Sequence, residues 1–152
     1  MRSSKPIMLV EDDLGDVTII KKVLKELEIK NEPIHSNNGE EALDYLTSEA
    51  NEKPCIIFLD LNMPRMNGIE FLKAIKADEK LKNIPVIALT TSQDGGDIEK
   101  CFQLGVAGYT VKPVNYTRFV KAIAIINLYW MLNEMPGECE RNIQIDDLVV
   151  SI

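Results

Sequence analysis

Short runs of apolar residues alternate along the chain with segments in which apolar residues recur every three or four positions. The short runs lack strict apolar–polar alternation, so they predict strands buried on both faces. The periodic segments predict helices that each carry an apolar stripe. The expected strands are residues 7–10, 33–36, 55–59, 85–89 and 108–111. The expected helices centre on residues 17–27, 42–46 and 69–76, and cover about 97–104 and 116–133.

The alternation of strand and helix indicates the fold class, since five such repeats favour an α/β domain with a parallel sheet and right-handed crossovers. A chain of 152 residues fits one domain. We expect this domain to cover residues 5–133 and to leave residues 134–152 as a C-terminal tail, which is too short for an output domain.

Charge and composition narrow the class of protein. The net charge of -7 argues against nonspecific binding to nucleic acid, and no apolar segment is long enough to span a membrane. The cysteines Cys55, Cys101 and Cys139 are widely spaced and suggest no zinc site. We interpret them as free thiols of a protein in the reducing cytoplasm.

Chemically active side chains follow four of the predicted strands. They are Glu11, Asp12 and Asp13, then Asp60, then Thr90, then Lys112. Because the C-terminal ends of all strands in a parallel sheet lie at the same edge, these residues are expected to converge. Clustered carboxylates raise one another's pKa unless a cation neutralises them, and their oxygens suit Mg²⁺. A carboxylate beside Mg²⁺ can form an aspartyl phosphate, and an ammonium group suits the phosphoryl oxygens.

Each of these residues also has a plainer interpretation. Asp13 alone would be a helix N-cap, Thr90 a turn residue and Lys112 a solvated surface charge. His35, the only histidine, lies in a predicted strand and is interpreted as structural. The combination at successive strand ends favours a phosphoryl-transfer site over these separate roles.

Four segments carry a resemblance to a known family. They are residues 9–12, 59–68, 85–90 and 105–113. Together they resemble the receiver domain of bacterial two-component response regulators, over residues 5 to about 133. The resemblance implies a flavodoxin-like, doubly wound sheet of five parallel strands in the order 2-1-3-4-5, with five helices.

The resemblance also implies a role for each residue of the site. Asp60 would be the phosphoacceptor. Glu11 and Asp12 would hold Mg²⁺ together with Asp60 and the backbone carbonyl of Asn62. Lys112 would contact the phosphoryl group.

Two further implications concern the switch between signalling states. Thr90 would also contact the phosphoryl group, and Thr90 and Tyr109 would be the two ends of a coupled conformational change. The peptide bond between Lys112 and Pro113 is often cis in the family.

A protein of this kind takes a phosphoryl group from a sensor histidine kinase in a Mg²⁺-dependent reaction. It signals through protein contacts or onward phosphorelay, and its own catalysis is slow self-dephosphorylation at most. The longer loop at residues 47–52 and the C-terminal tail are similar to single-domain regulators paired with bacterial phytochrome-type kinases. Thr91 and Ser92 depart from the family, in which a small residue commonly follows the threonine.

Two alternatives compete with this interpretation. One is a receiver-like adaptor that works without phosphorylation, which the complete set of site residues argues against. The other is a phosphatase of the haloacid-dehalogenase type, which also has an aspartyl nucleophile after a strand. Such phosphatases usually carry a second Asp two residues later as general acid, and here Asn62 cannot serve that purpose.

The helix at residues 116–133 is apolar around most of its circumference, with few polar positions such as Lys121 and Asn127. A helix outside a sheet needs only one apolar stripe, so a second buried face is expected. We interpret this face as the contact of a homodimer, or of a docked partner, formed with residues 97–104 and 108–111. Covering of the same face by the C-terminal tail is the alternative.

Overall fold

The computed structural model of the chain describes residues 5–132. Its centre is a five-stranded parallel sheet in the order β2-β1-β3-β4-β5, which confirms the expected topology. The strands are β1 (Ile7–Val10), β2 (Pro33–Ser36), β3 (Ile56–Leu59), β4 (Val86–Thr90) and β5 (Gly108–Val111). The helices are α1 (Leu14–Glu26), α2 (Gly39–Thr47), α3 (Gly68–Lys76), α4 (Gly95–Gln103) and α5 (Tyr116–Leu132).

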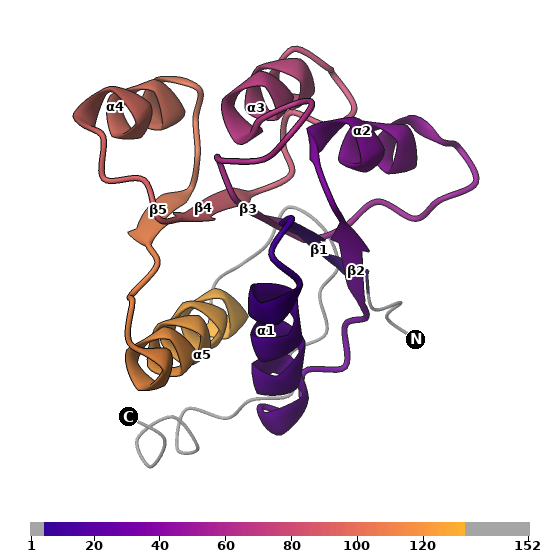
Figure 1. Cartoon of the computed structure of the whole chain (residues 1–152). Helices are drawn as coiled ribbons and strands as arrows, with labels where there is room; N and C mark the ends of the chain where they lie inside the picture. The colour runs from indigo at the N-terminus through magenta and orange to yellow at the C-terminus, as the bar shows by residue number, and fades with distance from the viewer. Residues whose placement is uncertain (1–4, 133–152) are drawn as a thin grey trace.

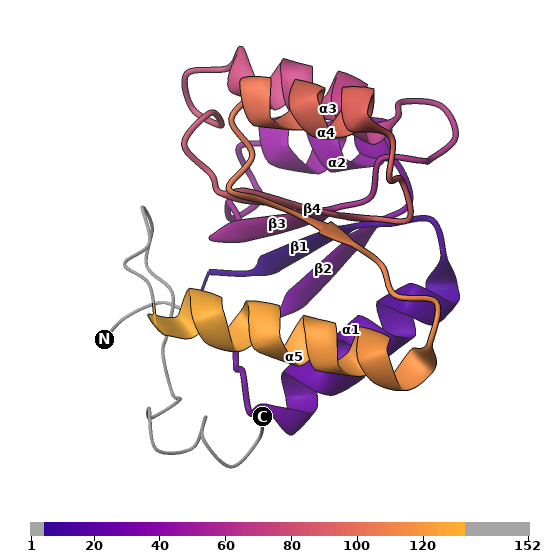
Figure 2. The ribbon, with the colours of Figure 1, turned by 90° about the vertical axis from the view of Figure 1, so that its left-hand side faces the viewer.

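The helices cover both faces of the sheet. Helices α2, α3 and α4 lie on one face, and α1 and α5 lie side by side on the other (Figure 1, Figure 2). Every residue of β1, β3 and β4 is buried, as their unbroken apolar runs predict. The expected C-terminal tail lies outside the described residues.

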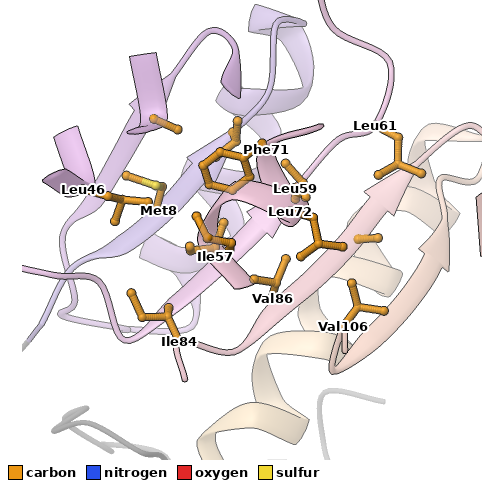
Figure 3. Packing of buried hydrophobic residues seen from close by; sticks show 14 of the residues in the cluster. Met8, Leu46, Ile57, Leu59, Leu61, Phe71, Leu72, Ile84, Val86 and Val106 are labelled. Atoms are coloured by element: carbon orange, nitrogen blue, oxygen red, sulfur yellow. The ribbon is translucent and has the colours of Figure 1, made fainter. Parts of the chain in front are cut away.

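Two apolar cores hold the layers together. Between the sheet and α2–α4, the Phe71 ring packs among Met8, Leu46, Ile57 and Leu72 (Figure 3). On the other face, side chains of α1 and α5 meet the opposite sides of the same strands. Burying one such side chain fully contributes about 1.5–3 kcal/mol. The two cores make the sheet a rigid support for the loops at its ends.

Helix α4 begins earlier than the sequence predicts. Asp94 is its N-cap, and the Asp94 Oδ1 atom accepts hydrogen bonds from the backbone N–H groups of Gly96 at 2.6 Å and Asp97 at 3.4 Å. The expected start at about residue 97 is therefore two residues late, because the cap draws Gly95 and Gly96 into the first turn. Gly105, with φ of +86°, follows the C-cap residue Leu104 of this helix.

Helix α5 buries one side and leaves apolar residues of another side in contact with solvent. Phe119 and Ile123 are buried, whereas Ile125 is 52% exposed and Leu132 is 48% exposed. Asn127 is buried, and its Nδ2 atom donates a hydrogen bond to the carbonyl of Ile123 at 2.7 Å. Part of the second apolar face predicted for this helix is thus present. Among residues 5–132, no helix combines the length and apolar character needed to cross a bilayer.

The cysteines differ in their chemistry. Cys101 is a free, buried cysteine, and burial raises the pKa of its thiol to about 11. Cys55 is disulfide-bonded. The interpretation of Cys55 as a free thiol is therefore wrong, because the pairing of cysteines cannot be deduced from their spacing in the sequence. Cys139 lies outside the described residues.

Candidate functional site

The register of the sheet brings the ends of neighbouring strands together. Val10 is the partner of Leu59 in the β1–β3 pair, so Glu11 and Asp60, which follow them, are neighbours. The backbone N–H of Asp60 donates to the carbonyl of Val10 at 2.9 Å, which extends the ladder past the last residue of β3. The loops that follow β1 and β5 lie at the same edge of the sheet (Figure 2). The fold thus places the acids and the lysine at one edge.

Three carboxylates gather at this edge. One ligand oxygen from each of Glu11, Asp12 and Asp60 lies within 4.8 Å of the others. Glu11 and Asp60 are buried, and Asp12 is exposed to solvent. Such a set of oxygens suits a hard divalent cation that keeps part of its hydration shell. The expected convergence of these three acids is therefore found in the structure.

Asp13 has a different position from the three clustered acids. It is the N-cap of α1, and its Oδ1 atom accepts hydrogen bonds from the backbone N–H groups of Gly15 at 2.9 Å and Asp16 at 3.2 Å. The plainer interpretation of Asp13, as a helix cap, is confirmed.

Lys112 supplies positive charge to the acids. Its side chain is 7% exposed, and its Nζ atom contacts the Glu11 carboxylate. The same Nζ atom lies 2.9 Å from Asp16 Oδ2 and 3.8 Å from Asp60 Oδ2. Burial alone would lower the pKa of Lys112, but the surrounding carboxylates outweigh it and raise that pKa. The lysine is therefore charged at neutral pH and is no solvated surface residue.

Burial raises the pKa of Glu11, and the nearby Asp60 carboxyl group raises it further. The hydrogen bond from Lys112 acts in the opposite direction but does not cancel this effect. Additional positive charge at the carboxylates would favour the ionised form of Glu11. The electrostatics of the site thus agree with its ligand geometry.

Thr90 and Tyr109 are connected through one residue, Ser92. Thr90 is fully buried at the end of β4, and its Oγ1 atom accepts a hydrogen bond from the Ser92 N–H at 3.3 Å. The Tyr109 hydroxyl group donates to the Ser92 carbonyl at 2.9 Å. Ser92 Oγ also donates to Asp97 Oδ2, at 2.7 Å, and so joins this loop to α4. Ser92 is thus hydrogen-bonded to Thr90, Tyr109 and α4.

The turn after Asp60 places Asn62 next to the acid cluster. The Asn62 N–H lies 3.4 Å from Asp60 Oδ1. Further along, Arg65 has a φ of +60°, and the N–H of Gly68 donates to the carbonyl of Leu61 at 3.0 Å, which closes the turn. Among residues 5–132 no peptide bond is cis. The bond between Lys112 and Pro113 is therefore trans, whereas the resemblance implies that it is often cis.

Sequence reasoning missed three contributors to this site. Asp16 bonds to Lys112, Ser92 connects Thr90 to Tyr109, and His35 Nε2 lies 2.6 Å from the carbonyl of Glu11. The His35 contact supports the loop after β1, which agrees with its structural interpretation. Only the acidic character of the first turn of α1 could have pointed to Asp16.

Comparison with known proteins shows the family of the chain. The response regulator receiver domain matches residues 7–124. Response regulator Rcp1 of Synechocystis sp. is 36% identical over 131 residues, which cover 84% of this chain and 89% of Rcp1.

Two solved structures share the fold across nearly their whole length. The Mn²⁺-bound form of response regulator Rcp1 has a TM-score of 0.84 and 35% identity, and the match covers 88% of this chain and 99% of that one. The phosphorylated cyanobacterial phytochrome response regulator RcpA has a TM-score of 0.84 and 34% identity, covering 89% and 100%. Fold, strand order and sequence therefore agree that this chain belongs to the family of response regulator receiver domains.

Proposed function

We propose that this chain accepts a phosphoryl group from a sensor histidine kinase on Asp60, in a reaction that requires Mg²⁺. The observation that carries the proposal is the position of Asp60, a buried carboxylate with Glu11 and Asp12 on one side and the Lys112 ammonium 3.8 Å away. The family supports it, since receiver domains are signalling proteins that histidine kinases phosphorylate. Output would pass through protein contacts or onward phosphorelay.

The proposed transfer is an exchange of one bond to phosphorus. An Asp60 carboxylate oxygen attacks the phosphorus of a phosphohistidine, the new O–P bond forms, and the P–N bond breaks with its electron pair going to the imidazole nitrogen. Lys112 and Thr90 donate hydrogen bonds to the phosphoryl oxygens. Glu11, Asp12, Asp60 and the backbone carbonyl of Asn62 are the proposed ligands of Mg²⁺, which supplies neutralising positive charge when bound.

The proposed conformational change starts at the hydrogen bond between the Thr90 hydroxyl group and the phosphoryl group. Attraction of the Thr90 hydroxyl group toward Asp60 would compete with the hydrogen bond that it accepts from the Ser92 N–H. Because Ser92 also contacts Tyr109 and Asp97, the conformational balance of β5 and α4 would shift with it. Phosphorylation would thereby change the surface that a partner reads.

Phosphoryl uptake that depends on Mg²⁺ tests this function. Incubation with acetyl phosphate and Mg²⁺ should add one phosphoryl group to the intact mass of the protein. Removal of the metal with EDTA should reduce the uptake strongly, because the clustered carboxylates would then repel the anionic donor. No adduct in the presence of Mg²⁺ would favour the phosphorylation-independent adaptor. Rapid turnover of small phosphate esters would favour the phosphatase.

The likeness to a phytochrome response regulator supports a kinase of the phytochrome type as the donor. We propose that residues 5–133 act as the receiver domain. A cytoplasmic location is part of the same proposal.

We propose that two copies of the chain associate through α4, β5 and α5. β5 is an edge strand of the sheet, and the two helices beside it expose large apolar side chains, Phe102 at 55% and Ile125 at 52%. Apolar side chains exposed next to a sheet edge are typical of a protein contact. Covering by the C-terminal tail, the alternative, lies outside the described residues.

A charge placed on this surface should prevent the association. The Phe102→Glu variant is expected to be monomeric by light scattering at tens of micromolar protein, where the unmodified chain should have the mass of a dimer. Lys121→Glu provides a control for a charge change elsewhere on α5, at a residue that is already exposed and polar. A monomeric mass of the unmodified chain, with and without phosphorylation, would contradict the proposal.

A further inference from the structure

Asp16 forms an ion pair with the Lys112 ammonium in addition to the one that Glu11 forms. The Asp16 Oδ2 atom lies 2.9 Å from Lys112 Nζ, although the two residues are 96 positions apart in the chain. The nearest oxygen of Asp60 is 3.8 Å from the same Nζ atom. The first distance is that of a charge-assisted hydrogen bond, and the second is too long for one.

The role of Asp16 differs from the usual one of an acid in the first turn of a helix. In α3 the equivalent residue, Glu70, completes a capping box by accepting a hydrogen bond from the N-cap backbone of Asn67. In α1 the Asp13 side chain caps the helix. The Asp16 carboxylate is directed across to Lys112, and its side chain is only 24% exposed. Helix capping therefore does not explain the position of the Asp16 carboxylate.

The donors of Lys112 are largely committed. An ammonium group has three N–H donors, and Glu11 and Asp16 each accept from Nζ within hydrogen-bond distance. A phosphoryl group on Asp60 needs the same ammonium, so it has to share Lys112 with these two carboxylates. Glu11 belongs to the proposed metal ligands, which leaves Asp16 as the acceptor devoted to Lys112.

We propose that Asp16 is a positioning residue that holds Lys112 back from Asp60 and thereby weakens the hold of the site on the phosphoryl group. This inference rests on the proposed function. Asp16 adds a negative charge beside the phosphoryl position, and it competes with the phosphoryl group for Lys112. Both effects weaken binding of the phosphoryl group. The phosphoryl group on Asp60 would then be lost more readily than it would be without the Asp16 carboxylate.

Equilibrium binding of beryllium trifluoride, a noncovalent phosphoryl mimic, tests the inference at saturating Mg²⁺. The Asp16→Asn variant is expected to bind the mimic roughly twofold to fivefold more tightly by calorimetry, the size of effect expected for one partly exposed ion pair. Asp16→Ser should show the same direction if the asparagine variant folds poorly. Asp13→Asn is the matched control, because it removes a charge from the same helix end while asparagine preserves the cap.

A double-mutant cycle separates competition for Lys112 from a general effect of charge. In a Lys112→Met background, Asp16→Asn should change binding of the mimic much less than in the unmodified chain. Asp16→Glu, which restores the charge, should return the affinity toward that of the unmodified chain. Unchanged or weaker binding of the mimic by Asp16→Asn, or an equal gain in affinity in Asp13→Asn, would overturn this inference and leave the proposed function standing. Failure of the unmodified chain to bind the mimic would overturn the proposed function with it.

Discussion

Replacement of Asp60 with asparagine is expected to abolish phosphoryl uptake from acetyl phosphate. An amide is a poor nucleophile, and the two other clustered acids are badly placed to replace Asp60. Glu11 is engaged by Lys112, and Asp12 is exposed to solvent. The measurement is the intact mass after incubation with Mg²⁺, in which the variant should show no added phosphoryl group.

Asp13→Asn is the matched control for Asp60→Asn. It removes one negative charge at the same edge of the sheet, outside the acid cluster, and it keeps a good N-cap for α1. This control should take up one phosphoryl group. Thermal unfolding should show Asp60→Asn to be at least as stable as the unmodified chain, because one source of repulsion is removed. A phosphoryl adduct on Asp60→Asn would place the acceptor elsewhere.

Replacement of Gly68 with alanine is expected to lower the free energy of unfolding by about 3 kcal/mol, the upper range for overpacking. A Cβ atom at this position would lie 2.4 Å from the carbonyl oxygen of Asp60 and 2.7 Å from Leu61 Cα. Both are backbone atoms, so the clash cannot be relieved by turning a side chain. The Asp60 peptide would have to move, and phosphoryl uptake should slow together with the loss of stability. Chemical denaturation and the rate of mass gain measure the two effects.

Gly95→Ala provides the comparison for Gly68→Ala. Gly95 also opens a helix, α4, but a Cβ atom there would meet no other atom within 4 Å. Alanine should be neutral or slightly stabilising at this position, since it reduces the entropy of the unfolded chain. Equal stability of the two alanine variants would contradict the steric account of Gly68.

The ends of β1 and β3 could be predicted because each apolar run stops at the last residue of the strand, where an acid follows it. The predicted and observed forms of β3 both end at Leu59, and this end alone places Asp60 at the edge of the sheet. Since the order of strands follows from the family resemblance, the convergence of Asp60 with Lys112 could be expected too. The start of α4 was harder to predict, because two glycines indicate a flexible loop unless the cap at Asp94 is recognised.

The contacts between side chains could not be predicted from the sequence. Asp16 has the usual character of a first-turn acid, and nothing near it in the chain points to Lys112. The close approach of Gly68 to Asp60 depends on how the turn after β3 folds back on its own strand. Ser92 appeared only as a departure from the family, although its backbone and hydroxyl group connect the threonine, the tyrosine and α4.

The position of Lys112 after the last strand has a consequence for synthesis of the protein. β1 and β3 are neighbours in the sheet, so a nascent chain can bring Glu11 and Asp60 together before the ribosome has added Lys112. Until then the two acids lack the ammonium group that contacts them in the finished fold. Their repulsion disfavours a compact state of the incomplete chain. Addition of β5 and Lys112 therefore removes one source of repulsion from the folding chain.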